Sequence, residues 1–328
     1  MKSSICEKPK YIFYNKSIDI ASYLLIFIIS YIGYLMYLDL PLLKSKYPLL
    51  TFNSFYDLKL SFCYLILLII LHYLSISLFY NLILNKCLRK NIEEECQSVY
   101  SFKIITNAFK LLFFIIMTAL GLKYFKATEF LYKSLGGTGD FGKYLNNNAE
   151  YVLNPGLTDQ IKQYYNIYLG FFIFEVYLLL KQPLQTDFLI MIIHHLSSIL
   201  LIVFSFVTNY TAIGSVVLYL MHIGDIFSGF VRSLVYTNLP DKVTVINVVI
   251  FLIIFGITRL GIFGDMIINI YIYFTKFDIR ITEIFLLSLL ILIYLLSLMW
   301  IILISQKLIA YLKTNKIEDI YKIKLKKK

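Results

Sequence analysis

Three of the four histidines in the chain lie close to an acidic residue, within two strongly apolar stretches. His194 and His195 are adjacent in the segment MIIHHLSSIL, and His222 precedes Asp225 by three positions in LYLMHIGDIF. Side chains at this spacing share one face of an α-helix. Titratable groups are costly inside a bilayer and usually face a bundle interior or a wet cavity. The sequence therefore predicts one buried functional cluster in this part of the chain.

The residue types in this cluster suit two chemistries. A histidine with an ionised aspartate behind it can act as a general base, or as a transient acyl acceptor, in the transfer of an acyl group to an amine. Three neutral imidazoles and a carboxylate would instead suit Zn²⁺ in an intramembrane hydrolase. A di-iron desaturase needs more histidines than the four present, so that class is excluded. His72 stands apart and is interpreted as a packed, hydrogen-bonded residue between helices.

The composition shows what kind of fold must position these groups. Of the residues, 59% are hydrophobic and only 16% are charged, and the mean hydropathy is +0.75. Apolar runs long enough to cross a bilayer recur along the whole chain. The predicted fold is an all-α polytopic membrane helix bundle with about eight transmembrane helices. The predicted spans are 18–38, 58–84, 104–122, 161–180, 188–208, 211–235, 243–273 and 283–305.

The seventh span is longer than an untilted helix needs, so we expect it to tilt or to break near Gly256, Gly261 or Gly264. The same span contains Arg259 and Asp265, which are expected to form a structural ion pair or a gate.

The predicted spans bring the polar residues into one layer. Only Asn209 and Tyr210 separate the fifth and sixth spans, which are therefore expected to be antiparallel neighbours. At about 1.5 Å per residue, His194 then lies roughly 10 Å deep. Glu175, near the end of the fourth span, falls in the same layer. The predicted constellation is Glu175, His194, His195, His222, Asp225 and Arg232.

Basic residues beside the spans favour cytosolic N- and C-termini. The net charge of +11 is interpreted as this topology signal and as an attraction to anionic membrane lipids, so nucleic acid is not an expected partner. The chain ends in KLKKK, which resembles a dilysine retrieval signal of the endoplasmic reticulum; a generic basic tail is the alternative interpretation. Three regions of the chain are predicted. Residues 1–100 form a cytosolic N-terminus, two spans and a charged loop, residues 101–312 form a six-span domain, and residues 313–328 form the tail.

The stretch HHLSSILLIVFSFVTNYTAIGSVVLYLMHIGDIFSGFVR resembles the TLC domain, and within it the longevity-assurance motif of ceramide synthases. Without gaps, the histidine pair of that motif falls on His194 and His195, and its second aspartate on Asp225. His222 stands where the motif has its first aspartate. The remaining matches are Asn209, Tyr210 and Gly214 at the turn, and Arg232 in place of a lysine.

The resemblance implies an N-acyltransferase that joins the fatty acyl group of acyl-CoA to a sphingoid base in the endoplasmic reticulum membrane. His194 or His195 would take the amine proton or carry the acyl group, with Asp225 and His222 as the supporting catalytic residues. The implied substrate-binding residues are Glu175, Asn209, Tyr210 and Arg232. No metal or bound cofactor is expected, since acyl-CoA is a co-substrate, and the chain is expected to contact membrane lipids and to allow a homodimer or heterodimer.

Two alternatives stay open at this point. The translocating-chain-associating membrane proteins share the TLC domain and have sequences similar to residues 232–236 of this chain. Such a protein would assist a translocon without catalysing a reaction. The intramembrane zinc hydrolase is the other alternative, because His222 adds a metal ligand.

Overall fold

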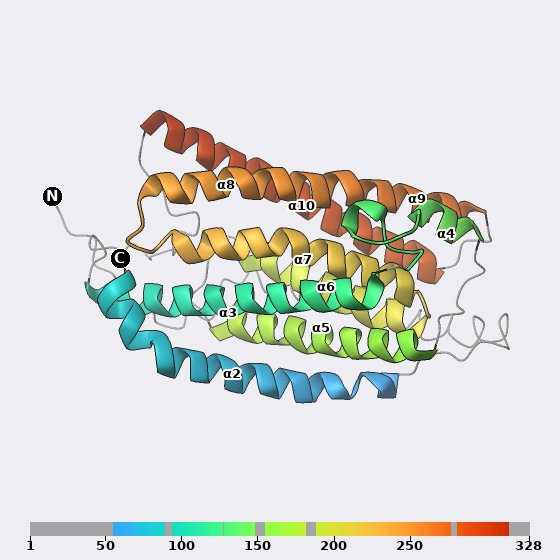
Figure 1. Ribbon diagram of the computed structural model, residues 1–328, viewed down its shortest axis with the longest axis horizontal. Coiled ribbons are helices and arrows are strands. Elements are labelled where there is room, and N and C mark those ends of the chain that lie inside the picture. Colours follow the sequence, from blue (N-terminus) through green and yellow to red (C-terminus); the bar gives the residue numbers. More distant parts are fainter. Residues whose placement is uncertain are drawn as a thin grey trace, which may run out of the picture.

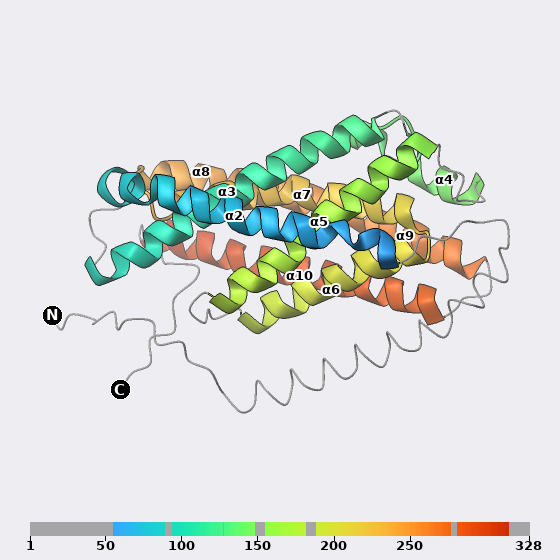
Figure 2. The ribbon, with the colours of Figure 1, turned by 90° about the horizontal axis from the view of Figure 1, so that it is seen from below.

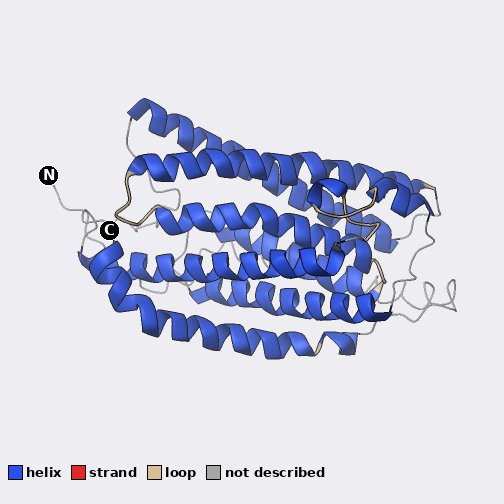
Figure 3. Cartoon of the chain, viewed as in Figure 1, coloured by secondary structure: helices blue, strands red, loops and turns tan. Residues whose placement is uncertain are grey.

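The computed structural model describes residues 55–88, 94–126, 128–147, 155–181, 188–276 and 281–314 (Figure 1). The first predicted span, 18–38, and the basic tail, 313–328 apart from its first two residues, lie outside these ranges. Within them the chain is helical, with no strand (Figure 3). The long helices are α2 (Leu60–Leu82), α3 (Glu94–Phe125), α5 (Pro155–Lys181), α6 (Phe188–Val207), α7 (Thr211–Leu234), α8 (Asp241–Phe255), α9 (Phe263–Thr275) and α10 (Ile281–Thr314).

Short elements complete the described chain. They are the 3₁₀ turns Phe55–Leu58 and Lys133–Leu135, the helix α4 (Phe141–Asn147), and the π-helical segments η2 (Ile83–Cys87) and η4 (Gly256–Ile262). Because η4 joins α8 to α9 without interruption, the three form one continuous helical stretch.

The long helices form one bundle in which successive spans run in opposite directions (Figures 1 and 2). We call the end where α6 begins and where α7 and α10 finish the tail end. The opposite end, with residues 128–147 and the turn between α6 and α7, is the loop end. α7 packs mainly against α3 and α8, and α6 packs against α5 and α10.

The predicted all-α membrane bundle is confirmed. Six helical stretches of the described chain are long and apolar enough to cross a membrane. They correspond to the predicted spans except 18–38 and 161–180. The latter is helix α5, of 27 residues, whose first turns carry Asp159 and Lys162. The apolar window of α7 is 56% buried within the protein and that of the α2 stretch only 11%, so α7 is the central helix and α2 faces outward.

The long seventh span departs from α-helical geometry where glycines allow it. The π-helical segment η4 contains Gly256 and Gly261, two of the three glycines at which a break is predicted. π-Helical turns inside α-helices are rare, and those that do occur are often found at functional sites. This one contains Arg259, which is only 2% exposed.

The turn between α6 and α7 depends on a residue that tolerates left-handed backbone geometry. Asn209 has a φ of 63°, the one positive φ at a non-glycine residue in the described chain. Asparagine accepts this conformation more readily than most residues because its short polar side chain can hydrogen-bond locally. Tyr210 then precedes α7, and its hydroxyl donates to the Glu283 carboxylate of α10 at 2.7 Å. This contact ties the turn to α10.

Gly214, one turn into α7, allows a close approach of α5. A methyl group at this position would collide with the Tyr165 hydroxyl and lie 2.9 Å from Ser205 Oγ. Tyr165 is fully buried, and its hydroxyl contacts Ser205 Oγ at 3.1 Å.

We therefore expect Gly214→Ala to destabilise the bundle by about 1–3 kcal/mol, as overpacking of a filled interior does. The measurement is the unfolding midpoint of the purified protein in detergent. Gly256→Ala is the matched control, because a methyl group there meets nothing within 4 Å. Equal midpoints for the two variants would show that Tyr165 moves aside without cost.

Candidate active site

A wide cavity of about 250 Å³, lined by many titratable residues, lies between α3, α5, α6, α7, α8, η4 and α10. Its lining includes aromatic side chains, and Lys307 of α10 places part of it toward the tail end. The titratable and hydrogen-bonding residues that line it are Asn107, Lys110, Glu175, His194, His195, His222, Asp225, Ser228, Arg232, Arg259 and Lys307. All six residues of the predicted constellation therefore line one cavity.

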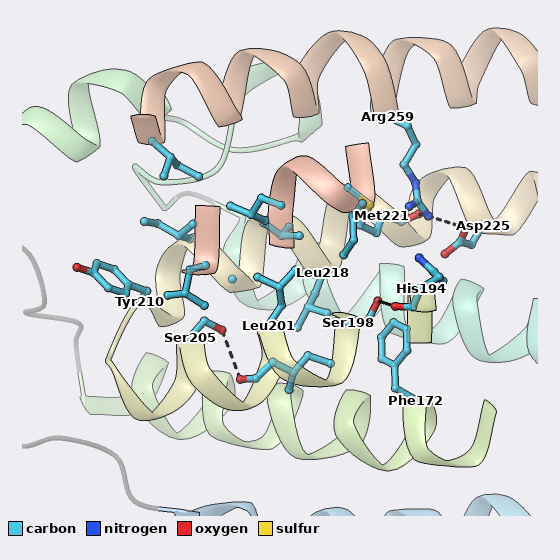
Figure 4. A pocket seen from close by; sticks show the side chains of 18 of the residues that line it. Phe172, His194, Ser198, Leu201, Ser205, Tyr210, Leu218, Met221, Asp225 and Arg259 are labelled. Carbon is cyan, nitrogen blue, oxygen red and sulfur yellow. Dashed lines mark hydrogen bonds and ion pairs between the residues drawn. The ribbon is translucent and has the colours of Figure 1, made fainter. Parts of the chain in front are cut away.

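A second, narrow cavity of about 60 Å³ is lined mostly by apolar side chains of α6, α7, α9 and α10. Figure 4 shows Tyr210 at one end of this cavity and His194, Asp225 and Arg259 at the other, with Leu201 and Leu218 between them. It follows α6 from His194 toward the loop end, since Ser198 and Ser205 also line it.

Four residues line both cavities, namely Phe172, His194, Asp225 and Arg259. His194 is therefore at the junction, whereas His195 lines only the wide cavity. The His194 ring packs edge-on against Trp300 with ring centroids 5.0 Å apart, and its neighbour ring, His195, is 5.4 Å away. The junction lies about 9 Å along α6 from its first residue, at about 1.5 Å per residue.

Arg259 pairs with Asp225 across the junction. Its Nη2 donates to Asp225 Oδ1 at 2.7 Å and to the Met221 carbonyl at 2.8 Å. The prediction that Arg259 pairs with Asp265 is wrong. Asp265 instead accepts hydrogen bonds from the Tyr132 hydroxyl at 2.9 Å and from Asn269 at 3.1 Å, near the loop end.

The π-turn explains this correction. Arg259 lies within η4, where the wider turns change the direction in which side chains leave the helix, and Asp265 lies beyond it in α9. Burial, and then the hydrogen bond to Asp265, raise the pKa of the Tyr132 hydroxyl, so that hydroxyl remains protonated and acts as the donor.

Glu175 forms the second ion pair of the site. Its Oε2 accepts a hydrogen bond from Lys110 Nζ at 2.6 Å and lies 3.9 Å from His195 Nε2. The Glu175 side chain is only 7% exposed, and its Oε1 has no partner. Glu175 and Lys110 therefore hold a compensated charge pair beside His195.

His222 is predicted to take the place of the motif's first aspartate as a hydrogen-bonding partner of the histidine pair. Its Nδ1 instead lies 2.7 Å from the Leu218 carbonyl, one turn earlier in α7. Its ring centroid lies 4.4 Å from that of Tyr168 and 5.2 Å from that of Phe114. His222 thus lines the wide cavity among aromatic rings, with a backbone partner.

The histidine pair has unused hydrogen-bonding capacity. Among the described residues, the Nδ1 atoms of His194 and His195 are buried and have no hydrogen-bond partner. An unsatisfied buried polar atom costs about 1–3 kcal/mol, so a ligand that reached these atoms would remove that cost. His72, in contrast, lies 3.0 Å from Thr106 Oγ1, among the rings of Phe102 and Phe109, and lines neither cavity.

The remaining predicted residues are placed differently. Arg232 lines the wide cavity, and its backbone carbonyl accepts a hydrogen bond from Asn107 at 3.3 Å. Tyr210 lines the far end of the narrow cavity. Asn209 lines neither cavity, and its backbone geometry assigns it to the turn between α6 and α7.

A family model of the TLC domain matches residues 103–306, well over half of the chain. The chain belongs to the TLC-domain family. The matched residues run from early in α3 to late in α10, so this TLC domain contains both cavities and their junction. The resemblance recognised in the sequence is confirmed.

Among characterised relatives, human ceramide synthase 5 is 31% identical over 122 residues. The match covers 36% of this chain and 30% of that protein. This TLC domain is thus similar to part of a ceramide synthase.

Sequence reasoning missed Lys110 and Trp300 as residues of this TLC domain's site. Lys110 falls inside the predicted span 104–122, where a charged side chain is as costly as the histidines that were selected. A charged residue in an apolar span is therefore the signal that could have identified Lys110. Trp300, the one tryptophan of the chain, carries no comparable signal in an apolar span.

The zinc alternative requires converging ligands. Among the described residues of the TLC domain, no three His, Cys, Asp or Glu side chains come together as a metal site would require. His222, the residue that distinguished this alternative, has its Nδ1 2.7 Å from the Leu218 carbonyl of its own helix.

Proposed function

We propose that this TLC-domain protein is an N-acyltransferase of the ceramide synthase type, which transfers the acyl group of a fatty acyl-CoA to a sphingoid base. One observation carries this proposal: a cavity lined by many titratable residues and a mostly apolar cavity meet at His194, whose Nδ1 has no hydrogen-bond partner among the described residues. The similarity to human ceramide synthase 5 supports the same class of reaction.

The linings of the two cavities differ in the same way as the two halves of a fatty acyl-CoA. The narrow cavity offers an apolar lining for the acyl chain. The wide cavity offers the basic side chains of Arg232 and Lys307 toward a phosphate-rich group. A substrate that occupied both would have its thioester at the junction, beside His194.

The acyl transfer can then be written with the residues of the junction. The amine nitrogen of the base attacks the thioester carbonyl carbon, the carbon–sulfur bond breaks, and CoA leaves. His194 accepts the proton that the amine loses and passes it to the departing sulfur, as a general base and then a general acid. The negative charge of Asp225 stabilises the imidazolium that forms. No metal or bound cofactor takes part, and acyl-CoA is the co-substrate.

We place the protein in the endoplasmic reticulum membrane, with its termini and the tail end of the bundle in the cytosol. The basic residues beside the spans support this orientation. Acyl-CoA then reaches the wide cavity from the cytosol, and the sphingoid base arrives from the membrane lipids. Nucleic acid is not a partner in this scheme, and a homodimer or heterodimer is compatible with it.

Purified protein in liposomes, given labelled acyl-CoA and a sphingoid base, is expected to produce amide and free CoA in equal amounts without a protein partner. The measurement is separation of the labelled amide, with thiol titration of CoA. Absence of amide with several chain lengths and bases, together with crosslinking to nascent chains, would favour the translocon-associated alternative.

A further inference from the structure

Arg259 is the most deeply buried charged side chain of the described residues, and part of its guanidinium is unused. It is 2% exposed. Nη2 donates to Asp225 Oδ1 and to the Met221 carbonyl, and the guanidinium carbon lies 5.2 Å from the centre of the Phe255 ring, whereas Nε and Nη1 have no hydrogen-bond partner among the described residues. A guanidinium has five N–H donors in a fixed planar fork, and unpaired buried donors are costly. Pairing with Asp225 therefore does not account for the whole group.

The position of Arg259 indicates what those donors face. Arg259 lines both cavities, and Figure 4 shows its guanidinium beside Asp225 and His194. Any molecule whose reacting carbon lies at His194 has the oxygen on that carbon within the same small region. A negatively charged oxygen atom at the head of a chain in the narrow cavity would suit these donors.

We propose that Arg259 binds the oxyanion that forms on the thioester carbonyl during acyl transfer. The inference rests on the proposed function. As nitrogen bonds to the carbonyl carbon, the electron pair of the C=O π-bond moves to the oxygen, where Arg259 donates to it. When that pair returns to re-form C=O, the carbon–sulfur bond breaks and the sulfur leaves with its electrons.

Asp225 fits this role as the counter-ion. It pairs with Nη2 and fixes the orientation of the guanidinium. The Nε and Nη1 donors are then held in place without a bond to Asp225. Donors placed in advance at a developing charge stabilise a transition state without reorganisation. A purely structural arginine would act only through Asp225, and this difference can be measured.

The first test is binding and needs no turnover. Palmitate carries a charged oxygen at the head of an acyl chain, and the matching alcohol, hexadecanol, does not. The protein in nanodiscs is expected to bind palmitate about tenfold to a hundredfold more tightly than hexadecanol, as charge-assisted hydrogen bonds imply. Arg259→Gln should remove this preference, and Asp225→Asn, which frees a further donor, should increase it.

The controls separate binding from folding. Lys276→Gln changes an exposed basic residue at the end of α9, away from both cavities, and should keep the preference. Arg259→Gln with Asp225→Asn removes both charges of the pair, so it remains informative if Arg259→Gln alone fails to fold. A preference for palmitate that survives in the double variant would overturn the proposal.

The second test is kinetic. In the Asp225→Asn background, Arg259→Gln is expected to lower kcat by a further 10²–10³-fold, about the effect of losing one oxyanion donor, with little change in the KM of acyl-CoA. An unchanged kcat in that background would mean that Arg259 acts only through Asp225, and would overturn the proposal. If the wild-type protein makes no amide, the proposed function fails, while the binding test still decides whether Arg259 binds the charged head of an acyl chain.

Discussion

Replacement of His194 by alanine is expected to lower amide formation by about 10²–10⁴-fold, the usual contribution of general acid–base catalysis. The reason is its position, because His194 is the one histidine that lines both cavities. Its Nδ1 also has no partner to lose, so the substitution leaves no protein group unsatisfied. The rate is measured in liposomes with labelled acyl-CoA, alongside the unfolding midpoint.

Two matched variants make this result specific. His72→Gln alters another buried histidine, which contacts Thr106 and lines neither cavity, and should keep most of the activity. His195→Ala removes the ring beside Glu175 and should reduce activity less than His194→Ala does. Full activity after alanine replacement of both members of the pair would end the catalytic interpretation.

Replacement of Asp225 by alanine is expected to lower the free energy of unfolding by about 3 kcal/mol. Removing one partner of a buried pair leaves the other charge uncompensated, and such changes cost about 3–5 kcal/mol. We expect the low end, because the Asp225 side chain is 27% exposed although Arg259 is only 2% exposed. The measurement is unfolding of the purified protein in detergent.

A double variant tests the physical reason for that loss. Arg259→Met combined with Asp225→Ala removes both charges, so most of the lost stability should return, whereas acyl transfer should not. If the double variant is no more stable than Asp225→Ala, the loss arises from packing of α7 against η4 and not from an unpaired guanidinium.

Much of this organisation could be predicted from local sequence. Apolar length predicts the membrane helices, and the short link at Asn209 and Tyr210 predicts that α6 and α7 are antiparallel. Together they place His194, His222 and Asp225 in one layer, as the wide cavity shows. The seventh span is predicted to tilt or to break near its glycines; the π-helical segment η4 contains two of them, and the helix continues through it without a break.

The partners within that layer could not be predicted in the same way. Spacing along a helix indicates which face a residue occupies, but hydrogen-bond partners depend on how neighbouring helices are rotated. Arg259 pairs with Asp225 because η4 packs on α7, and Lys110 meets Glu175 because α3 lies beside α5. His222 bonds to its own helix because aromatic rings enclose it.

The π-turn at η4 also bears on how such a site is gained or lost in evolution. A hydrogen-bonded ring in a π-turn holds one residue more than in an α-helix, so η4 stores a single inserted residue while α8 and α9 keep their faces toward α7 and α10. Deletion of one codon in 256–262 would restore the regular period and turn Arg259 by about 100° relative to one of its flanking helices, away from Asp225. A single-codon deletion would thus give a related protein that lacks the Arg259–Asp225 pair but keeps all of its membrane-spanning helices.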